Sequence, residues 1–260
     1  MIVDERRSRI LKIVEESGFV SLQRLVTEVG ASESTIRRDL EFLDGTGQIQ
    51  RTHGGASFLG DSHTDFDTRR NRASQEKQQI AQHTASLISA GETVLLDGGT
   101  TTLEVARHLT GKSLQVLTNS LPIASLLMNR PEIELIFIGG YVYPKTGVAL
   151  GEHSVEALKK MHATRLVMST GGITAEGLFN SNALLVETER QMIRAADRVT
   201  LVADSSKFGQ RALTHLCPLS DVDEIVTDDG ISDEWRQIMT HAGLKMELAE
   251  ARGGLMKVTR

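Results

Sequence analysis

The sequence predicts an α/β protein in two parts, a small helical N-terminal unit and a larger unit built on a largely parallel sheet. Two observations predict this division. Residues 1–58 carry helical hydrophobic patterns and one pair of short strands, whereas apolar strands alternate with helices over residues 74–250. Between them, residues 59–73 form the expected linker, because its first part, residues 60–67, is rich in Gly, Asp and His.

Three helices are predicted in the N-terminal unit, over residues 6–17, 21–29 and 32–43, because apolar side chains recur in each at helical spacing. Gly18 is expected to end the first helix. Only Gly30 and Ala31 separate the second helix from the third, which is the short, glycine-containing turn of a helix-turn-helix. The side chains expected to face the core are Ile10, Ile13, Val14, Leu22, Leu25, Val26, Val29, Ile36, Leu40 and Leu43.

The polar side of the third helix suits contact with DNA. Ser32 stands at the N-cap position, and short hydroxyls and two guanidinium groups follow it. Such groups bind phosphates and base edges in the major groove, although a solvated surface is the commoner reason for two adjacent arginines. Short strands over residues 49–51 and 56–58 enclose a candidate wing, and this context favours double-stranded operator DNA as a partner. The residues expected to contact DNA are Ser32, Ser34, Thr35, Arg37, Arg38, Arg51 and His53.

The charge balance argues against a protein that coats nucleic acid without specificity. The formal net charge is −5, and the first 57 residues hold eight Lys/Arg against nine Asp/Glu. DNA affinity must therefore come from the placement of a few arginines. A homo-oligomer, dimer or tetramer, is expected because it doubles those contacts.

Composition narrows the remaining classes of protein. The single cysteine, Cys217, excludes an internal disulfide, fits a reducing cytoplasm and is expected to be a structural thiol. No apolar run approaches the ~18 residues of a membrane span, so no membrane partner is expected. No metal-ligand spacing or nucleotide-binding motif is present, so we expect no metal and no cofactor.

The larger unit is predicted to be doubly wound, because its strands are apolar throughout and alternate with helices. Strands are expected over residues 93–97, 114–118, 133–138, 148–151, 165–169, 199–203, 225–227 and 244–248. Helices are expected over residues 74–89, 103–109, 120–128, 155–161, 186–196 and 233–241.

Small polar residues follow five of these strands, and ligands of such sheets bind at the carboxyl ends of the strands. Glycines at 98 and 99 allow the backbone to approach an anion, and residues 100–102 open a helix whose N–H groups face the same point. The carboxylates of Asp97 and Asp204 and the side-chain amide of Asn119 suit the hydroxyl groups of a sugar. A tight turn, a helix cap and a surface lysine are the alternative explanations. The residues expected to bind a phosphorylated sugar are Asp97, Gly98, Gly99, Thr100, Thr101, Thr102, Asn119, Ser120, Gly139, Gly140, Gly171 and Lys207.

Motifs in both parts resemble the DeoR family of bacterial transcription regulators. They are Thr35-Ile36-Arg37-Arg38-Asp39-Leu40, Arg51-Thr52-His53-Gly54-Gly55-Ala56, Asp97-x-Gly-Thr-Thr, Thr118-Asn119-Ser120, Gly139-Gly140 and Asp204-Ser205-Ser206-Lys207-Phe208-Gly209. The resemblance implies a winged helix-turn-helix followed by a sensor domain related to sugar-phosphate isomerases. Many members carry a lysine where this chain has Glu189 and an acidic residue where it has Gly171, which leaves the identity of the effector open.

The linker ends in a basic cluster, Arg69, Arg70 and Arg72. A solvated basic edge is the favoured interpretation of this cluster. A phosphate contact near the DNA, or contact with the sensor domain, is the alternative.

We therefore expect a cytoplasmic transcription regulator, a repressor of a sugar-catabolism operon controlled by a phosphorylated sugar or related metabolite. An activator with the same parts is one alternative. A sugar-phosphate isomerase is another, in which Asp97, Glu187 or Asp204 is the base and Lys207 the electrophile. An isomerase needs no helix-turn-helix, so no catalytic activity is expected.

Overall fold

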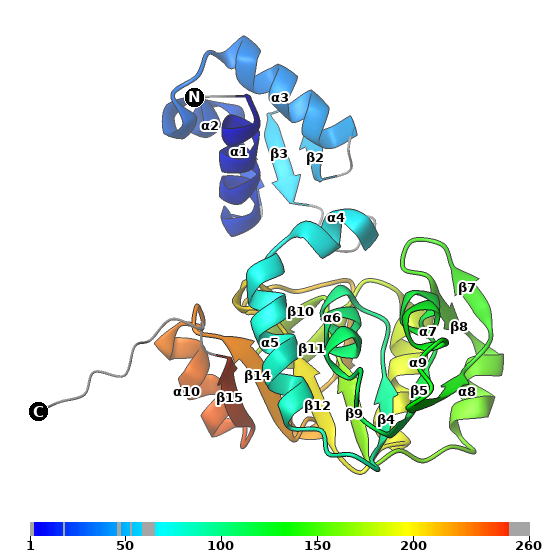
Figure 1. Ribbon diagram of the computed structural model, residues 1–260. Helices are drawn as coiled ribbons and strands as arrows, with labels where there is room; N and C mark the ends of the chain where they lie inside the picture. The colour runs from blue at the N-terminus through cyan, green and yellow to red at the C-terminus, as the bar shows by residue number, and fades with distance from the viewer. Residues whose placement is uncertain (1–2, 18, 46–47, 53, 59–65, 250–260) are drawn as a thin grey trace, which may run out of the picture. The chain divides into compact units, whose positions relative to one another are not determined.

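The computed structural model describes residues 3–17, 19–45, 48–52, 54–58 and 66–249. The chain forms two compact units, Met1–Asp65 and Phe66–Arg260, each of which has its own core (Figure 1). Gly18, His53, residue 250 and residues 59–65 of the expected linker lie outside the described residues.

The N-terminal unit is a winged helix-turn-helix, as predicted. Its elements are α1 (Val3–Ser17), β1 (Phe19–Ser21), α2 (Leu22–Val29), α3 (Glu33–Gly45), β2 (Ile49–Thr52) and β3 (Gly55–Phe58). Strand β1 was not predicted; it pairs with β3, so that the wing is part of an antiparallel sheet of order β1-β3-β2. A Cβ on Gly55 would lie 2.0 Å from the carbonyl oxygen of Val20, so this close strand approach requires glycine.

The predicted core of this unit is confirmed. Seven of the ten expected side chains are buried, and Ile13, Leu22 and Val26 pack against them partly buried. Gly30 ends α2 in the left-handed conformation, with φ +72°, and its N–H bonds to the carbonyl of Val26. This glycine sets the turn that leads into α3.

The second unit begins with α4 (Phe66–Asn71) and α5 (Ser74–Ser86). Its parallel strands are β4 (Thr93–Leu96), β5 (Leu114–Thr118), β6 (Ile133–Phe137), β9 (Arg165–Met168), β12 (Val199–Val202), β14 (Glu224–Asp228) and β15 (Lys245–Ala249). The helices between them are α6 (Thr100–His108), α7 (Leu121–Leu127), α8 (Glu152–Leu158), α9 (Ala183–Arg194) and α10 (Asp233–His241), with 3-10 turns at Ser205–Lys207 and Leu219–Asp221.

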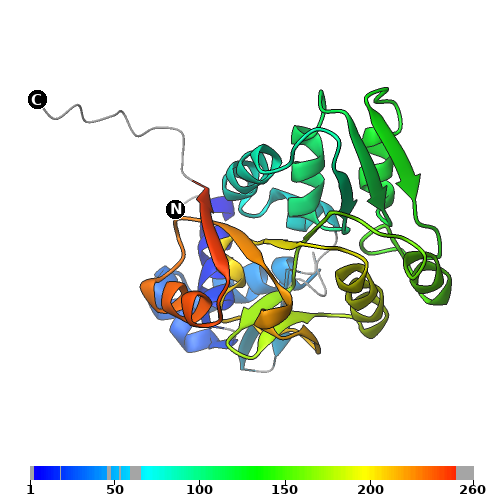
Figure 2. The same ribbon diagram turned by 90° about the horizontal axis from the view of Figure 1, so that it is seen from below.

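Helices cover both faces of this sheet, as predicted for a doubly wound fold (Figures 1 and 2). Alternate residues of each strand enter different cores: Val94 and Leu96 pack with α5, α6 and α7, whereas Leu95 packs on the opposite face with α8, α9 and α10. Within the described residues, no helix combines the length and the apolar character needed to cross a membrane.

The sheet order is β15-β14-β12-β9-β4-β5-β6, and every pairing is parallel. After β4 the chain continues through α6 to β5 on one side. After the neighbouring strand β9 it continues through α9 to β12 on the other side. The carboxyl ends of β4 and β9 therefore form the topological switch point, where open α/β sheets leave a crevice.

Two smaller sheets were not predicted. Strands β10 (Gly172–Thr174), β11 (Gly177–Asn180) and β13 (Thr214–Cys217) form an antiparallel sheet beside the large one. Strand β7 (Tyr141–Tyr143) pairs with β8 (Val148–Leu150), so the strand expected near residue 148 stands outside the parallel sheet. Residues 66–71 also differ from the linker expected through residue 73, because α4 lies in the second unit and packs against α6.

Candidate DNA-binding surface and effector site

The N-terminal end of α3 gathers most of the residues expected to contact DNA. The hydroxyl of Ser32 accepts a 3.3 Å hydrogen bond from the N–H of Thr35, which is the predicted N-cap contact. The Ser32 Oγ also lies 2.8 Å from Thr35 Oγ1 and 3.1 Å from Ser34 Oγ. Three hydroxyls therefore form one exposed cluster at the positive end of the helix, where phosphate oxygens bind favourably.

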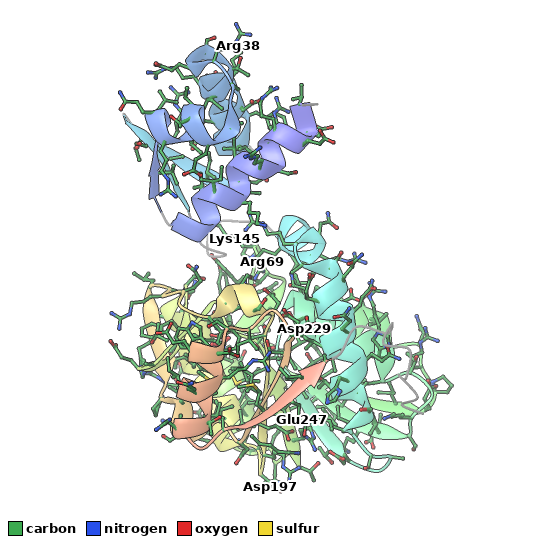
Figure 3. All side chains as sticks on the ribbon, turned by 90° about the vertical axis from the view of Figure 1, so that its left-hand side faces the viewer. Arg38, Arg69, Lys145, Asp197, Asp229 and Glu247 are labelled. Carbon is green, nitrogen blue, oxygen red and sulfur yellow. The ribbon has the colours of Figure 1, made fainter. Side chains whose placement is uncertain are left out.

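The two arginines of α3 differ in their surroundings. Arg37 donates from Nε and Nη2 to Glu33 Oε1, at 3.0 and 2.7 Å, in an exposed pair one helical turn apart. Arg38 is exposed and has no hydrogen bond or ion pair to another described residue (Figure 3). The guanidinium of Arg38 is thus the one ready for a new partner without breaking an existing pair.

The wing supplies Arg51 on β2. Its N–H bonds to Asp44 Oδ1 at 3.0 Å, and its guanidinium lies 3.8 Å from Glu41 Oε1, so β2 and α3 are tied together. His53 lies outside the described residues.

At the switch point of the second unit, buried acceptors meet the start of α6. Asp97 follows β4 and is 1% exposed; its Oδ2 accepts a 3.5 Å hydrogen bond from the N–H of Ser169, which follows β9. Asn119 follows β5, is fully buried, and donates from Nδ2 to the Ala149 carbonyl at 2.9 Å. Among the described residues, Asp97 Oδ1 and Asn119 Oδ1 have no hydrogen-bond partner, although both are buried. Such acceptors suit the hydroxyl groups of a ligand.

The turn between β4 and α6 is closely packed. A Cβ on Gly98 would lie 1.9 Å from Val148 Cγ1, and a Cβ on Gly99 would lie 2.1 Å from Ser169 Oγ. The hydroxyl of Thr102 accepts from the N–H of Gly99 at 2.7 Å and donates to its carbonyl. Thr102 therefore closes the turn itself, while Thr100 and Thr101 stand at the start of α6.

Three other predicted residues have internal structural partners. Ser120 caps α7, because its hydroxyl accepts from the N–H of Ile123. The carbonyl of Gly139 accepts a 2.9 Å hydrogen bond from the Ser154 hydroxyl, and a Cβ on Gly140 would lie 2.2 Å from that same hydroxyl oxygen. These contacts explain Ser120 and Gly140 without a ligand, whereas the contact of Gly139 involves only its main chain.

A chain of hydrogen bonds that the sequence analysis missed supports the loop after β9. The N–H of Gly171 donates to Asn180 Oδ1 at 2.8 Å, and Asn180 Nδ2 donates to both carboxyl oxygens of Glu189 at 2.7 and 2.8 Å. Burial, followed by the charge of Asp97, raises the pKa of Glu189 well above its ordinary value. Glu189 thus stands close to Asp97, although no spacing in the sequence links it to β11.

The other acidic groups of the site are also buried. Burial raises the pKa of Asp97 to about 6 and raises that of Asp204, whose carboxylate accepts from the N–H and hydroxyl of Ser206. Lys207 lies in the same 3-10 turn and is half-buried. Glu187, by contrast, is exposed to solvent on α9.

The basic cluster before α5 is not the solvated edge that the sequence favoured. Arg69 and Arg72 are half-buried, and only Arg70 is exposed. Figure 3 shows Arg69 at the same end of the sheet as Asp229, which follows β14, and at the opposite end from Asp197, which precedes β12. The alternative, contact with the second unit at its strand ends, is therefore the better description.

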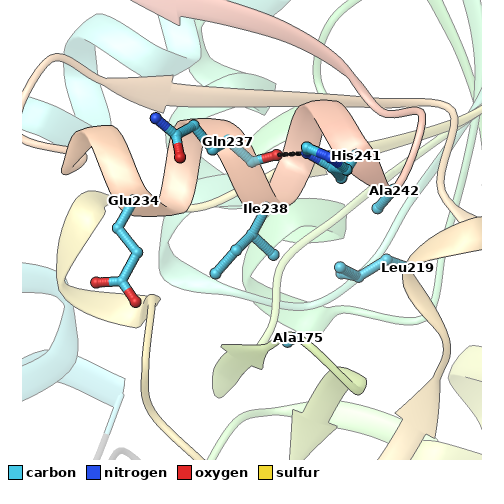
Figure 4. Close-up of a pocket in the computed structure, with 7 residues that line it drawn as sticks. All are labelled: Ala175, Leu219, Glu234, Gln237, Ile238, His241 and Ala242. Carbon is cyan, nitrogen blue, oxygen red and sulfur yellow. Dashed lines mark hydrogen bonds between the residues drawn. The ribbon is translucent and has the colours of Figure 1, made fainter.

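A shallow groove elsewhere in this unit has a volume of about 450 Å³ (Figure 4). It lies along α10 and is lined by Ala175, Leu219, Glu234, Gln237, Ile238, His241 and Ala242. None of the residues expected to bind the effector lines it.

The single cysteine, Cys217, is buried. Burial raises the pKa of its thiol to about 12, in keeping with a structural thiol.

A helix-turn-helix with an exposed arginine on its third helix, joined to an α/β unit with buried polar groups at its switch point, is the architecture of ligand-responsive DNA-binding regulators. Two family models match the chain: the DeoR-like helix-turn-helix domain over residues 6–61 and the DeoR C terminal sensor domain over residues 72–229. The chain belongs to the DeoR family of transcription regulators.

The relatives agree with this assignment. The chain is 32% identical over 247 residues to the glycerol-3-phosphate regulon repressor of Escherichia coli, covering 94% of this chain and 98% of that protein. It is 32% identical over 234 residues to the HTH-type transcriptional regulator YulB of Bacillus subtilis, covering 89% of this chain and 91% of that protein.

Among solved structures, ribose 5 phosphate isomerase A from Neisseria gonorrhoeae is similar over 52% of this chain and 53% of that chain, with 14% identity and a TM-score of 0.39.

Proposed function

We propose that this protein represses a sugar-catabolism operon and that a phosphorylated sugar or polyol controls its binding to operator DNA. The observation that carries the effector proposal is the pair of buried oxygens, Asp97 Oδ1 and Asn119 Oδ1, beside the N-terminus of α6. Oxygens without partners suit hydroxyl groups, and a helix N-terminus suits a phosphate. A relative named as a glycerol-3-phosphate regulon repressor supports the same ligand class.

Within this proposal, Thr100, Thr101 and Lys207 contact the phosphate, while Asp97 and Asn119 accept hydrogen bonds from hydroxyls. Thr102 and Ser120 act by holding the turns, because their hydroxyls are already engaged. The protein acts in the cytoplasm, where the operator DNA of a bacterium lies. It acts as a homo-oligomer, because paired winged helices match paired operator half-sites.

A thermal-shift series tests the effector proposal. Glycerol 3-phosphate, ribose 5-phosphate and fructose 6-phosphate are compared with glycerol, ribose and fructose, because a ligand that binds only the folded state raises its melting temperature. At least one phosphate ester should raise the melting temperature clearly more than its parent compound. Thr101→Val and Lys207→Ala should reduce that shift. Equal shifts with the free sugars would refute a phosphate site.

We also propose that the protein does not turn over these sugar phosphates. Of the three carboxylates considered as the base, Glu187 is exposed on α9, and Asp204 already accepts hydrogen bonds from the N–H and hydroxyl of Ser206. A relative of this chain is named as a repressor, which supports a sensor without turnover. Incubating the full chain with each phosphate ester and measuring aldose–ketose conversion tests this proposal. Conversion that Asp97→Asn abolishes would favour the isomerase instead.

A further inference from the structure

Arg69, in helix α4, and Arg72, directly after it, have no role in the DNA-binding or effector contacts proposed above. Helix α4 is the first element of the second unit, so it directly follows the chain segment that leads from the DNA-binding unit. It packs against α6, the helix whose N-terminus faces the proposed effector. Both Arg69 and Arg72 direct buried guanidinium nitrogens, Nε and Nη2, away from solvent.

A buried lysine fixes α4 in this place. Lys77, on the first turn of α5, is 4% exposed, and its Nζ donates to the carbonyl oxygens of Arg69 and Arg72 at 2.6 and 2.7 Å. These carbonyls lie at the end of α4, where helix carbonyls lack partners within the helix. Ala73 completes the link between α4 and α5 in the left-handed conformation, with φ +46°, the only such non-glycine among the described residues. The main chain of both arginines is therefore anchored to α5 through Lys77.

Their side chains lie within electrostatic reach of the effector site. The charge of Arg69 opposes the effect of burial on the pKa of Asp97. Burial lowers the pKa of Lys77, the charge of Asp204 opposes this, and the charges of Arg69 and Arg72 lower it further. Three cations thus gather beside the carboxyl ends of β4 and β12. Arg69 is further oriented by Phe66, whose ring centroid lies 5.8 Å from the guanidinium carbon.

We infer that Arg69 and Arg72 bind the anionic group of the effector opposite the N-terminus of α6, and that the occupied site thereby restrains α4. This inference rests on the proposed effector class. The two guanidinium groups provide the planar donors that phosphate oxygens accept in pairs. Because α4 opens the second unit, the same contacts carry the effect of the ligand to the segment that leads to the DNA-binding unit.

Calorimetric titration of the full chain tests the binding step. The ligands are inorganic phosphate and the three phosphate esters named above, and the variants are Arg69→Gln and Arg72→Gln. Arg70→Gln is the matched control, because Arg70 is exposed on the same helix. We expect each of the first two variants to bind phosphate compounds about 10- to 100-fold more weakly than the wild type, and the control to bind like the wild type. Arg69→Lys, which keeps the charge, should lose less affinity, and circular dichroism checks folding.

Hydrogen–deuterium exchange of peptides covering residues 66–73 tests the second step. Saturating ligand should slow exchange there in the wild type and in Arg70→Gln, but not in the Arg69→Gln, Arg72→Gln double variant. Wild-type affinity in Arg69→Gln and Arg72→Gln would overturn the inference and leave the proposed effector standing. Unchanged exchange over residues 66–73 in the liganded wild type would overturn transmission through α4. A wild type that binds none of these compounds would overturn the proposed effector class, and the inference with it.

Discussion

Asp39, on the third helix of the DNA-binding unit, accepts a 2.6 Å hydrogen bond at Oδ2 from Nε of Arg6 on the first. Its other oxygen, Oδ1, accepts from Nε of Arg7 at 3.1 Å, and the carboxylate is almost completely buried. Arg7 in turn stacks over Phe42, with its guanidinium carbon 3.6 Å from the ring centroid. The acidic residue that follows the two exposed arginines of α3 therefore sets the orientation of that helix against α1.

Asp39→Asn should destabilise the DNA-binding unit and leave the second unit intact, because an amide cannot replace a carboxylate bonded to two guanidinium groups. A loss of about 1 kcal/mol lowers the melting temperature of a 60–100-residue domain by about 4–8 °C, so a shift of several degrees is expected. The only tryptophan, Trp235, lies in the second unit, so its fluorescence follows that unit alone. Circular dichroism should show an earlier first transition while the fluorescence transition stays in place. Asp4→Asn, the same substitution at an exposed position of α1, is the control.

Arg38→Ala should weaken binding to an operator selected in vitro from random duplexes. Loss of a bidentate base contact costs about 1–3 kcal/mol, whereas loss of a phosphate contact lowers the salt slope by about one. Arg37→Ala should have a smaller effect, because Arg37 must weaken its contact with Glu33 to reach DNA. Fluorescence anisotropy over a salt series distinguishes the two kinds of contact. Arg9→Ala, which removes an exposed charge from α1, controls for bulk electrostatics; equal losses in Arg9→Ala and Arg38→Ala would refute a specific role for α3.

Asp97→Asn should stabilise the protein at neutral pH while weakening effector binding. The pKa of Asp97 rises from 3.8 to about 6 on folding, so the folded state keeps a proton that the unfolded state has lost. Ionising Asp97 in the folded state therefore lowers the free energy of unfolding. This loss is absent below pH about 3.8, grows between pH 3.8 and about 6, and is complete above pH about 6. At 1.36 kcal/mol per pH unit it reaches about 2–3 kcal/mol. Urea unfolding at pH 4 and pH 7.5 measures it: the variant should match the wild type at the lower pH and exceed it at the higher.

Lys77→Met should loosen α4 with little change in overall stability, because relief of a buried charge offsets the lost hydrogen bonds to the carbonyls of Arg69 and Arg72. Hydrogen exchange over residues 66–72 should speed up, while the Trp235 fluorescence transition moves little. Lys159→Met, at the exposed C-terminal end of α8, is the control. If exchange over residues 66–72 were unchanged, Lys77 would not be what holds the helix.

Much of the architecture was predictable because short apolar runs such as those around Val94 and Val116, which alternate with helical patterns, are typical of buried parallel strands. The parallel topology then brought the residues after each strand to one edge, which is why Asp97 and Asn119 were identified. The short strands β1, β10 and β11 were missed because three or four residues carry no periodic signal, and their pairing depends on tertiary contacts.

The supporting residues of the site were harder to predict for the same reason. Glu189 reaches the site only because β11 places Asn180 beside α9. Lys77 sits on a helix that looks polar in the sequence, and its burial depends on α4 folding back against α6. Whether a charged residue such as Lys77 is buried depends on tertiary contacts, which the local sequence pattern does not show.

If the phosphorylated effector releases this repressor from its operator, effector and operator binding must oppose each other, and one calorimetric experiment measures that coupling. The phosphate ester that gives the largest thermal shift is titrated into the full chain, alone and saturated with the selected operator. Coupling free energies of about 1–3 kcal/mol are typical, and linkage requires each ligand to weaken the other by the same factor. We expect the effector to bind about 5- to 150-fold more weakly in the presence of operator. Equal effector affinities in the two titrations would contradict it.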